Sequence, residues 1–161
     1  MFKKYVVILV LPVIVLFACG KSSDYDNCPS TGGIPTAAEM ADLKAYLTSK
    51  SITATEDSRG FYYNIINPGY GDFYPTSSST VQAKYRGTLT DGTVFDSTET
   101  GKTAIFSLSA VVLGWQYGVP LIKKTGIVDL YLPPTLGYGC RASGKIPASS
   151  ILIFRVELVN Y

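Results

Sequence analysis

Histidine is absent from the sequence, and this absence excludes several classes of catalytic and metal site. Without an imidazole the chain cannot build a histidine metal site or a His-dependent catalytic triad. Charge is also sparse, since Asp, Glu, Lys and Arg together make up 16% of the residues. Without Lys3 and Lys4, which lie in a segment that we expect to be removed, basic and acidic residues are equal in number. No basic excess remains, so we expect no nucleic-acid partner.

Long apolar runs are rare as well, and the clearest one lies at the N-terminus. Lys3 and Lys4 are followed by residues 5–18, which are uncharged and almost wholly apolar. A basic pair ahead of a short apolar run is typical of a secretory signal peptide, and the run is too short to span a bilayer comfortably. The alternative interpretation is an N-terminal membrane anchor that is never cleaved.

The residues that end this run favour the signal peptide. Leu16-Phe17-Ala18-Cys19 resembles the bacterial lipobox, in which the cysteine is lipidated, palmitate included, and becomes the new N-terminus. We therefore expect residues 1–18 to be a lipoprotein signal peptide. Several acyl chains on Cys19 would hold the protein stably on a membrane of the bacterial cell envelope, facing the periplasm or the cell surface.

A linker follows the predicted lipidation site. Residues 19–36 are polar and rich in turn-forming residues, as expected of a segment that lets a domain stand away from a membrane. Cys28 lies in this linker and Cys140 lies in the folded part. In an oxidising envelope the two could form a disulfide, or both could remain free thiols, because the sequence gives no distance between them.

The full sequence has 161 residues, of which 47% are hydrophobic. The part after the linker is long enough for one domain with a single core. Its first pattern is helical: between residues 35 and 50, Met40, Leu43 and Leu47 recur at spacings of three and four. The pattern predicts an amphipathic helix that either braces the domain or mediates dimerisation.

A strand pattern follows, in which apolar and polar residues alternate. Residues 61–65, 81–86, 127–132 and 151–159 predict antiparallel strands, and Asp91-Gly92 predicts a hairpin turn. One short helix is expected over residues 115–124, where Gly114 and Gly126 suit its ends and Pro120 limits its length. These elements predict an α+β fold.

Four sequence blocks appear in order within the strand-rich part. Residues 85–97 lead from a strand tyrosine through an Asp-Gly turn to a Phe-Asp pair, and residues 111–115 place a hydrophobic pair before Gly-Trp. Residues 132–139 read Leu-Pro-Pro-Thr-Leu-Gly-Tyr-Gly, and residues 146–158 contain Ile-Pro and then a closing strand. In this order the blocks resemble the FKBP-type peptidyl-prolyl cis-trans isomerase family.

The resemblance implies a definite architecture. An FKBP-like curled antiparallel sheet of five to six strands would wrap around the short helix, with residues 73–161 as the isomerase domain. Residues 37–72 would form a helix and strand extension, the N-terminal amphipathic helix included, like that of bacterial envelope members of the family.

The resemblance also implies a pocket and roles for its residues. Trp115 would form the floor, Asp96 would lie beside the isomerising bond, and Tyr138 and the Val112 N–H would donate to substrate carbonyls. The other implied contacts are aromatic or aliphatic: Tyr85, Phe95, Phe106, Phe154, Val111 and Ile146.

Aromatic and aliphatic residues at alternating strand positions are equally what an ordinary core contains. Asp96 differs, because an enclosed carboxylate needs a hydrogen-bond donor, and the resemblance suggests the Tyr85 hydroxyl.

Such a pocket suits rotation about an Xaa-Pro bond, whose barrier of about 18–20 kcal/mol comes from amide resonance. No covalent bond breaks, so we expect neither a metal nor a cofactor. The predicted function is isomerisation of proline-containing unfolded or exported polypeptides, which assists the folding of envelope proteins. The alternatives are a non-catalytic FKBP-like binding module or holdase chaperone, and a purely structural lipoprotein.

Overall fold

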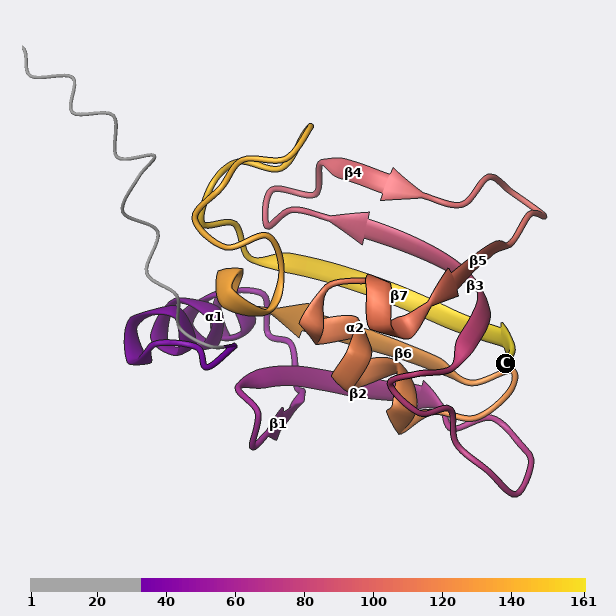
Figure 1. The fold of residues 1–161 in the computed structure, drawn as a ribbon. Helices are drawn as coiled ribbons and strands as arrows, with labels where there is room; N and C mark the ends of the chain where they lie inside the picture. Colours follow the sequence, from indigo (N-terminus) through magenta and orange to yellow (C-terminus); the bar gives the residue numbers. More distant parts are fainter. Residues whose placement is uncertain (1–32) are drawn as a thin grey trace, which may run out of the picture.

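The computed structural model describes residues 33–161 (Figure 1). The predicted signal peptide, the lipidation site Cys19 and the linker residue Cys28 lie outside the described residues, so these predictions and the pairing of Cys28 stay predictions. Cys140, within the described part, is disulfide-bonded. None of the helices in residues 33–161 combines the length and the apolar character needed to cross a bilayer.

The body of the described chain is a sheet of seven strands in the order β1-β2-β6-β7-β3-β4, with β5 paired to β3, and all neighbouring strands are antiparallel (Figure 1). The strands are β1 (Thr55–Asp57), β2 (Phe61–Asn67), β3 (Thr80–Thr88), β4 (Val94–Ser97), β5 (Ala104–Ser107), β6 (Ile127–Leu132) and β7 (Leu152–Asn160). The predicted α+β, FKBP-like fold is confirmed, but the expected strand number of five to six was too low. The strands β1 and β5 have only three and four residues, too few to show an alternating pattern.

One short helix, α2 (Leu113–Gly118), lies on the inner face of the sheet and continues into the 3₁₀ turn η3 (Val119–Leu121). The prediction of a helix over residues 115–124 was wrong at both ends. The α-helical part begins earlier and ends at Gly118, because Pro120 cannot donate a helical hydrogen bond and the chain tightens into η3 instead.

The close packing of α2 on β6 depends on two glycines. A methyl group at Gly114 would collide with the Leu132 side chain, and one at Gly118 would collide with Leu130. The helix therefore lies directly on the sheet, and the inward-facing residues of the three central strands join it in the main core. These residues are Val81, Ala83, Val128, Leu130, Leu132, Leu152, Phe154, Val156 and Leu158.

A second helix, α1 (Ala37–Ser49), covers part of the outer face. Its buried residues Leu43 and Leu47 pack with Tyr62 and Tyr131, which point outward from β2 and β6. The apolar stripe predicted from the sequence is thus used for packing within the chain. Thr36 caps the helix, since its hydroxyl accepts the Glu39 N–H at 3.2 Å.

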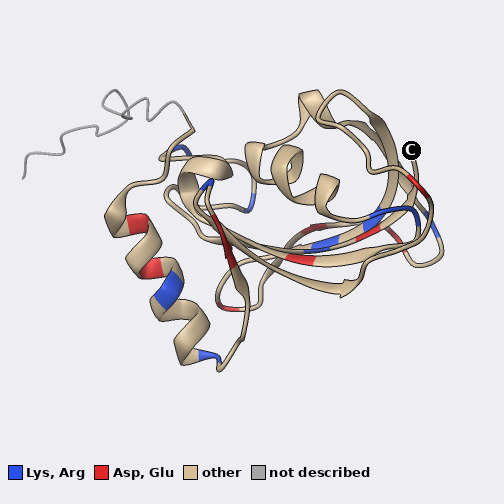
Figure 2. Cartoon of the chain, turned by 90° about the horizontal axis from the view of Figure 1, so that it is seen from below, with Lys and Arg blue, Asp and Glu red and all other residues tan. Residues whose placement is uncertain are grey.

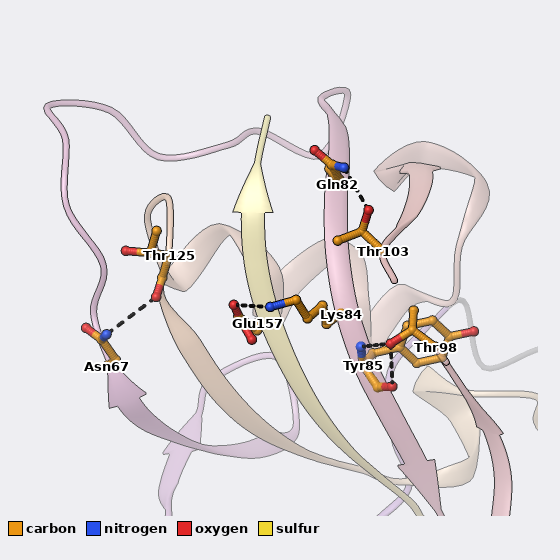
Figure 3. Close-up of polar contacts among 8 residues, drawn as sticks. All are labelled: Asn67, Gln82, Lys84, Tyr85, Thr98, Thr103, Thr125 and Glu157. Carbon is orange, nitrogen blue, oxygen red and sulfur yellow. Dashed lines mark hydrogen bonds and ion pairs between the residues drawn. The ribbon is translucent and has the colours of Figure 1, made fainter. Parts of the chain in front are cut away.

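The outer face that α1 leaves uncovered carries paired charges. Arg155 donates to both carboxylate oxygens of Asp129 at 2.7 Å, and Lys84 donates to Glu157 at 2.9 Å, each pair joining neighbouring strands. Figure 2 shows the charged residues spread along the strands and along α1, and Figure 3 shows the Lys84–Glu157 pair. These paired charges therefore lie on the side of the sheet opposite to α2.

Candidate active site

A cavity of about 230 Å³ opens between α2 and the inner face of the sheet. Its walls come from β3, β4, β5 and β7, from the connection between η2 (Leu108–Ala110) and α2, and from the loop after η4 (Pro134–Leu136). The lining residues are Tyr85, Asp96, Phe106, Ala110, Val111, Val112, Trp115, Tyr138 and Phe154. Segments far apart in the sequence thus meet around one cavity.

Trp115 of α2 is the deepest of the aromatic residues in this cavity, with 4% of its surface exposed. Its ring lies edge-to-face with three others, at centroid distances of 5.3 Å to Tyr85 and 5.5 Å to both Phe106 and Phe154. Perpendicular rings lock one another in place, so the floor is rigid and apolar. Within residues 33–161 the Trp115 indole N–H has no hydrogen-bond acceptor.

The one carboxylate in the cavity is held by a phenol. The Tyr85 hydroxyl donates to Asp96 Oδ2 at 2.5 Å, which is the hydrogen bond that the family resemblance implied. Burial, followed by this hydrogen bond and the negative charge of Asp96, raises the pKa of Tyr85 well above its ordinary value. Tyr85 therefore stays protonated and keeps Asp96 oriented at neutral pH.

The backbone around Asp96 is fixed by Thr98. The Thr98 hydroxyl accepts the Tyr85 N–H at 3.2 Å (Figure 3), and the Thr98 N–H donates to the Tyr85 carbonyl at 3.0 Å. The chain is therefore clamped to β3 immediately after β4, which keeps Asp96 facing Tyr85.

Two donors stand at the opening of the cavity. Tyr138 is 44% exposed on the loop that follows η4, so its hydroxyl can reach a bound ligand. Val112 precedes α2, and its N–H donates to no acceptor among residues 33–161. The Gln116 amide donates to the Val111 carbonyl at 2.9 Å. Because C=O and N–H point in opposite directions in a trans peptide, this bond fixes the direction of the Val112 N–H.

Two predicted contact residues do not line the cavity. Phe95 packs behind the wall, 5.4 Å from Phe154 and so close to Gly87 that a side chain there would collide with its ring. Ile146 is 5% exposed within the main core. Phe95 thus supports the wall from behind, and direct contact of either residue with a substrate remains a prediction.

Other residues of the site were not predicted from the sequence. Ala110 lines the cavity beside Val111, and nothing in its local pattern marks it. Gln116 and Thr98 act through hydrogen bonds to backbone groups, which leave no trace in residue periodicity. Phe106, by contrast, was among the predicted contact residues, and it lines the cavity whereas its neighbour Ile105 is 71% exposed.

No group of three or more Cys, Asp or Glu side chains in residues 33–161 is arranged to hold a metal ion. What the described cavity offers is an apolar floor, one oriented carboxylate and donors at the rim.

Comparison with known proteins shows the family to which the chain belongs. Residues 71–159 match the profile of the family described as FKBP-type peptidyl-prolyl cis-trans isomerase. The chain belongs to this family. Every residue that lines the FKBP cavity lies within the matched part, whereas α1, β1 and β2 precede it.

Two bacterial proteins of the FKBP family illustrate the similarity. The FKBP-type peptidyl-prolyl cis-trans isomerase FkpA of Buchnera aphidicola is 40% identical over 119 residues, which are 73% of this chain and 46% of that protein. The outer membrane protein MIP of Legionella longbeachae is 42% identical over 103 residues, which are 63% of this chain and 44% of that protein. The chain thus spans less than half the length of either relative.

A solved FKBP structure agrees with the fold. The crystal structure of FkpA from Escherichia coli superimposes with a TM-score of 0.69 at 37% identity, over 77% of this chain and 59% of that one. The fold of the sheet and α2 is therefore that of the FKBP family.

Proposed function

We propose that this protein is a peptidyl-prolyl cis-trans isomerase that acts on Xaa-Pro bonds of extended polypeptides. The observation that carries the proposal is the rigid apolar floor at Trp115, enclosed by perpendicular rings and flanked by an oriented carboxylate. A proline ring is apolar and compact, and it fits such a floor without needing a hydrogen bond. The polypeptide on either side of the proline meets donors at the rim.

Catalysis in this site would rest on preferential binding of the twisted amide. The planar amide carries more negative charge on its oxygen than the twisted form does, because resonance moves the nitrogen lone pair onto oxygen. A dry aromatic cavity solvates this charge poorly, and a carboxylate such as Asp96 near the oxygen disfavours it further. The twisted form is then bound better than either planar form, which lowers the barrier.

The rim donors would hold the substrate while its central bond rotates. The Val112 N–H and the Tyr138 hydroxyl can each bind a carbonyl of the polypeptide that flanks the proline, which fixes one part of the chain as the other turns. The hydrogen bond from Gln116 to the Val111 carbonyl keeps the Val112 N–H pointed at the same place. No step requires a nucleophile, a metal or a cofactor.

The proposal also extends to the place of action. The Leu16-Phe17-Ala18-Cys19 motif supports lipidation of Cys19, and a relative that is named as an outer membrane protein supports an envelope location. Tethered in this way, the protein would act on unfolded or newly exported proteins of the bacterial envelope. Mass spectrometry of the purified mature chain tests the anchor, since an unmodified Cys19 contradicts it.

The isomerase proposal is tested with the purified chain in a refolding reaction whose rate is limited by proline isomerisation. We expect acceleration by the wild type and a loss of roughly 100-fold in Trp115→Ala, with large losses in Asp96→Ala and Phe95→Ala. Phe73→Ala is the matched control, because Phe73 is an aromatic residue that is 77% exposed and does not line the cavity.

The same preparation decides between the isomerase and its alternative. A wild-type chain that suppresses aggregation but leaves the proline-limited rate unchanged is a non-catalytic binding module or holdase. Trp115→Phe serves as a second variant, because it keeps an aromatic floor if the alanine variant fails to fold.

A further inference from the structure

Glu39 connects the first turn of α1 to the loop that carries Tyr138. Its Oε1 accepts both the backbone N–H and the hydroxyl of Thr135, at 2.9 and 2.8 Å. Its Oε2 accepts the Thr36 N–H at 2.7 Å and the Thr135 hydroxyl at 2.9 Å. The carboxylate thus caps the start of α1 and binds a residue 96 positions further along the chain.

Thr135 is the middle residue of η4, and Tyr138 lies in the turn that continues directly from η4. The Pro134 carbonyl accepts the N–H groups of Gly137 and Gly139, at 2.9 and 2.8 Å, and these residues flank Tyr138 on either side. A shift of the Thr135 backbone therefore moves the turn on which Tyr138 is mounted. Figure 1 shows this turn beside α1, at the end of the sheet where the helix lies.

These hydrogen bonds are stronger than bonds between neutral groups, because every one of them is made to a charged acceptor. Burial alone would raise the pKa of Glu39, but the hydrogen bonds from Thr36 and Thr135 outweigh it and lower the pKa below the ordinary value. The carboxylate is therefore ionised at neutral pH and keeps its grip on Thr135.

The segment ahead of α1 also reaches the other side of the cavity. Gly33 lies so close to Leu113, the first residue of α2, that an added methyl group would stand 2.9 Å from the leucine side chain. Leu113 directly follows Val112, the second rim donor. The chain before β1 thus touches elements on both sides of the opening.

We propose that Glu39 is a positioning residue, which sets the Tyr138 hydroxyl over the cavity and makes α1 part of the catalytic unit. This inference rests on the proposed isomerase function. It assigns a role to a helix that lies ahead of the residues matched by the family profile.

The matched control is Thr36→Ala. Thr36 and Glu39 together form the capping box of α1, so either substitution weakens the start of the helix. Only Glu39→Ala also removes the carboxylate that binds Thr135. Glu39→Gln keeps one carbonyl-type acceptor in place of the carboxylate and should recover part of the contact.

The first measurement is kcat and KM of the full chain with a proline-containing tetrapeptide. We expect Glu39→Ala to lower kcat/KM roughly tenfold, mainly through kcat, because a misplaced Tyr138 hydroxyl no longer holds the flanking carbonyl while the Xaa-Pro bond rotates. Glu39→Gln should lie between it and the wild type, and Thr36→Ala should stay within about twofold of the wild type. In a Tyr138→Phe background, Glu39→Ala should cause no further loss.

Two results would overturn the proposal: equal losses in Thr36→Ala and Glu39→Ala, or losses that add fully in the Tyr138→Phe background. Either would mean that Glu39 acts through the stability of α1 and not through Tyr138.

A second measurement does not depend on activity. Amide hydrogen exchange at Gly137 and Gly139 should become at least about tenfold faster in Glu39→Ala and stay unchanged in Thr36→Ala, because only the first removes the hydrogen bonds between Glu39 and Thr135. Unchanged exchange in Glu39→Ala contradicts the positioning role. A wild-type chain without isomerase activity would contradict the proposed function alone, and the exchange rates would still decide whether Glu39 holds the loop.

Discussion

The two faces of the sheet are stabilised by different kinds of side chain. The inner face packs aliphatic residues under α2 and gathers its aromatic rings around Trp115, with Asp96 as the single carboxylate of the cavity. The outer face holds the apolar stripe of α1 and, beyond it, ion pairs between neighbouring strands. The difference separates two tasks: the inner face forms the site, and the outer face can bear charge because no ligand has to be desolvated there. Substitutions on the outer face should therefore lower mainly stability, and substitutions on the inner face should lower mainly activity.

The largest effect on stability is expected on the outer face, from Leu43→Ala. Leu43 is fully buried between α1 and the sheet, so its truncation should lower the free energy of unfolding by about 2–5 kcal/mol. Because it does not touch the cavity, kcat/KM of the folded fraction should change little. Urea unfolding and the tetrapeptide assay measure the two quantities on the same sample. If activity falls by more than the fraction of unfolded protein explains, the packing of α1 on the outer face also affects the site on the inner face.

The opposite pattern is expected on the inner face, from Gln116→Leu. This change keeps the size of the side chain and removes the hydrogen bond to the Val111 carbonyl, so the Val112 N–H loses its fixed direction. We expect kcat/KM to fall roughly tenfold while the free energy of unfolding changes by only about 1 kcal/mol. Gln82→Leu is the control, because Gln82 donates to Thr103 away from the cavity (Figure 3). Equal activity in both variants would rule out a role of Gln116 at the rim.

A smaller effect, which depends on pH, is expected at the turn between β1 and β2. The hydrogen bonds from Arg59 lower the pKa of Asp57 below its ordinary value, against the raising effect of burial. A lowered folded-state pKa adds stability above the unfolded-state pKa, and this stability disappears as the pH falls through the folded-state value. Asp57→Asn should therefore be less stable than the wild type at pH 7, and the difference should shrink below about pH 4. Unfolding curves at pH 7, 5 and 3 measure it, with Asp42→Asn as an exposed carboxylate control. A difference that stays constant over this range would assign the effect to the turn geometry.

The sequence was informative wherever a residue's role follows from its own neighbourhood. Alternation along β3 and β7 predicted which side chains face inward, because a strand that is buried on one face must alternate. The block order predicted the family and most of the cavity lining, including the pairing of Tyr85 with Asp96. The four-residue spacing of Leu43 and Leu47 likewise predicted α1.

What the sequence could not predict depends on distance in space. The Glu39–Thr135 contact joins residues 96 positions apart, so no local pattern reveals it. Only the position of Glu39 at the start of α1 had a local signal, because Thr36-Ala37-Ala38-Glu39 is a capping box that could have been recognised. The position of Phe95 behind Phe154, rather than in the cavity, follows from the close approach to Gly87 on the neighbouring strand. The early end of α2 reflects a choice between α and 3₁₀ turns at Pro120, which periodicity does not resolve.

The place of Trp115 makes the protein its own optical reporter. The chain contains one tryptophan, and that residue forms the floor of the cavity, in contact with three other rings. Intrinsic fluorescence excited at the red edge of indole absorption therefore comes from the site alone. Binding of a polypeptide can be titrated without a label, and a client that docks elsewhere on the surface would leave the emission unchanged.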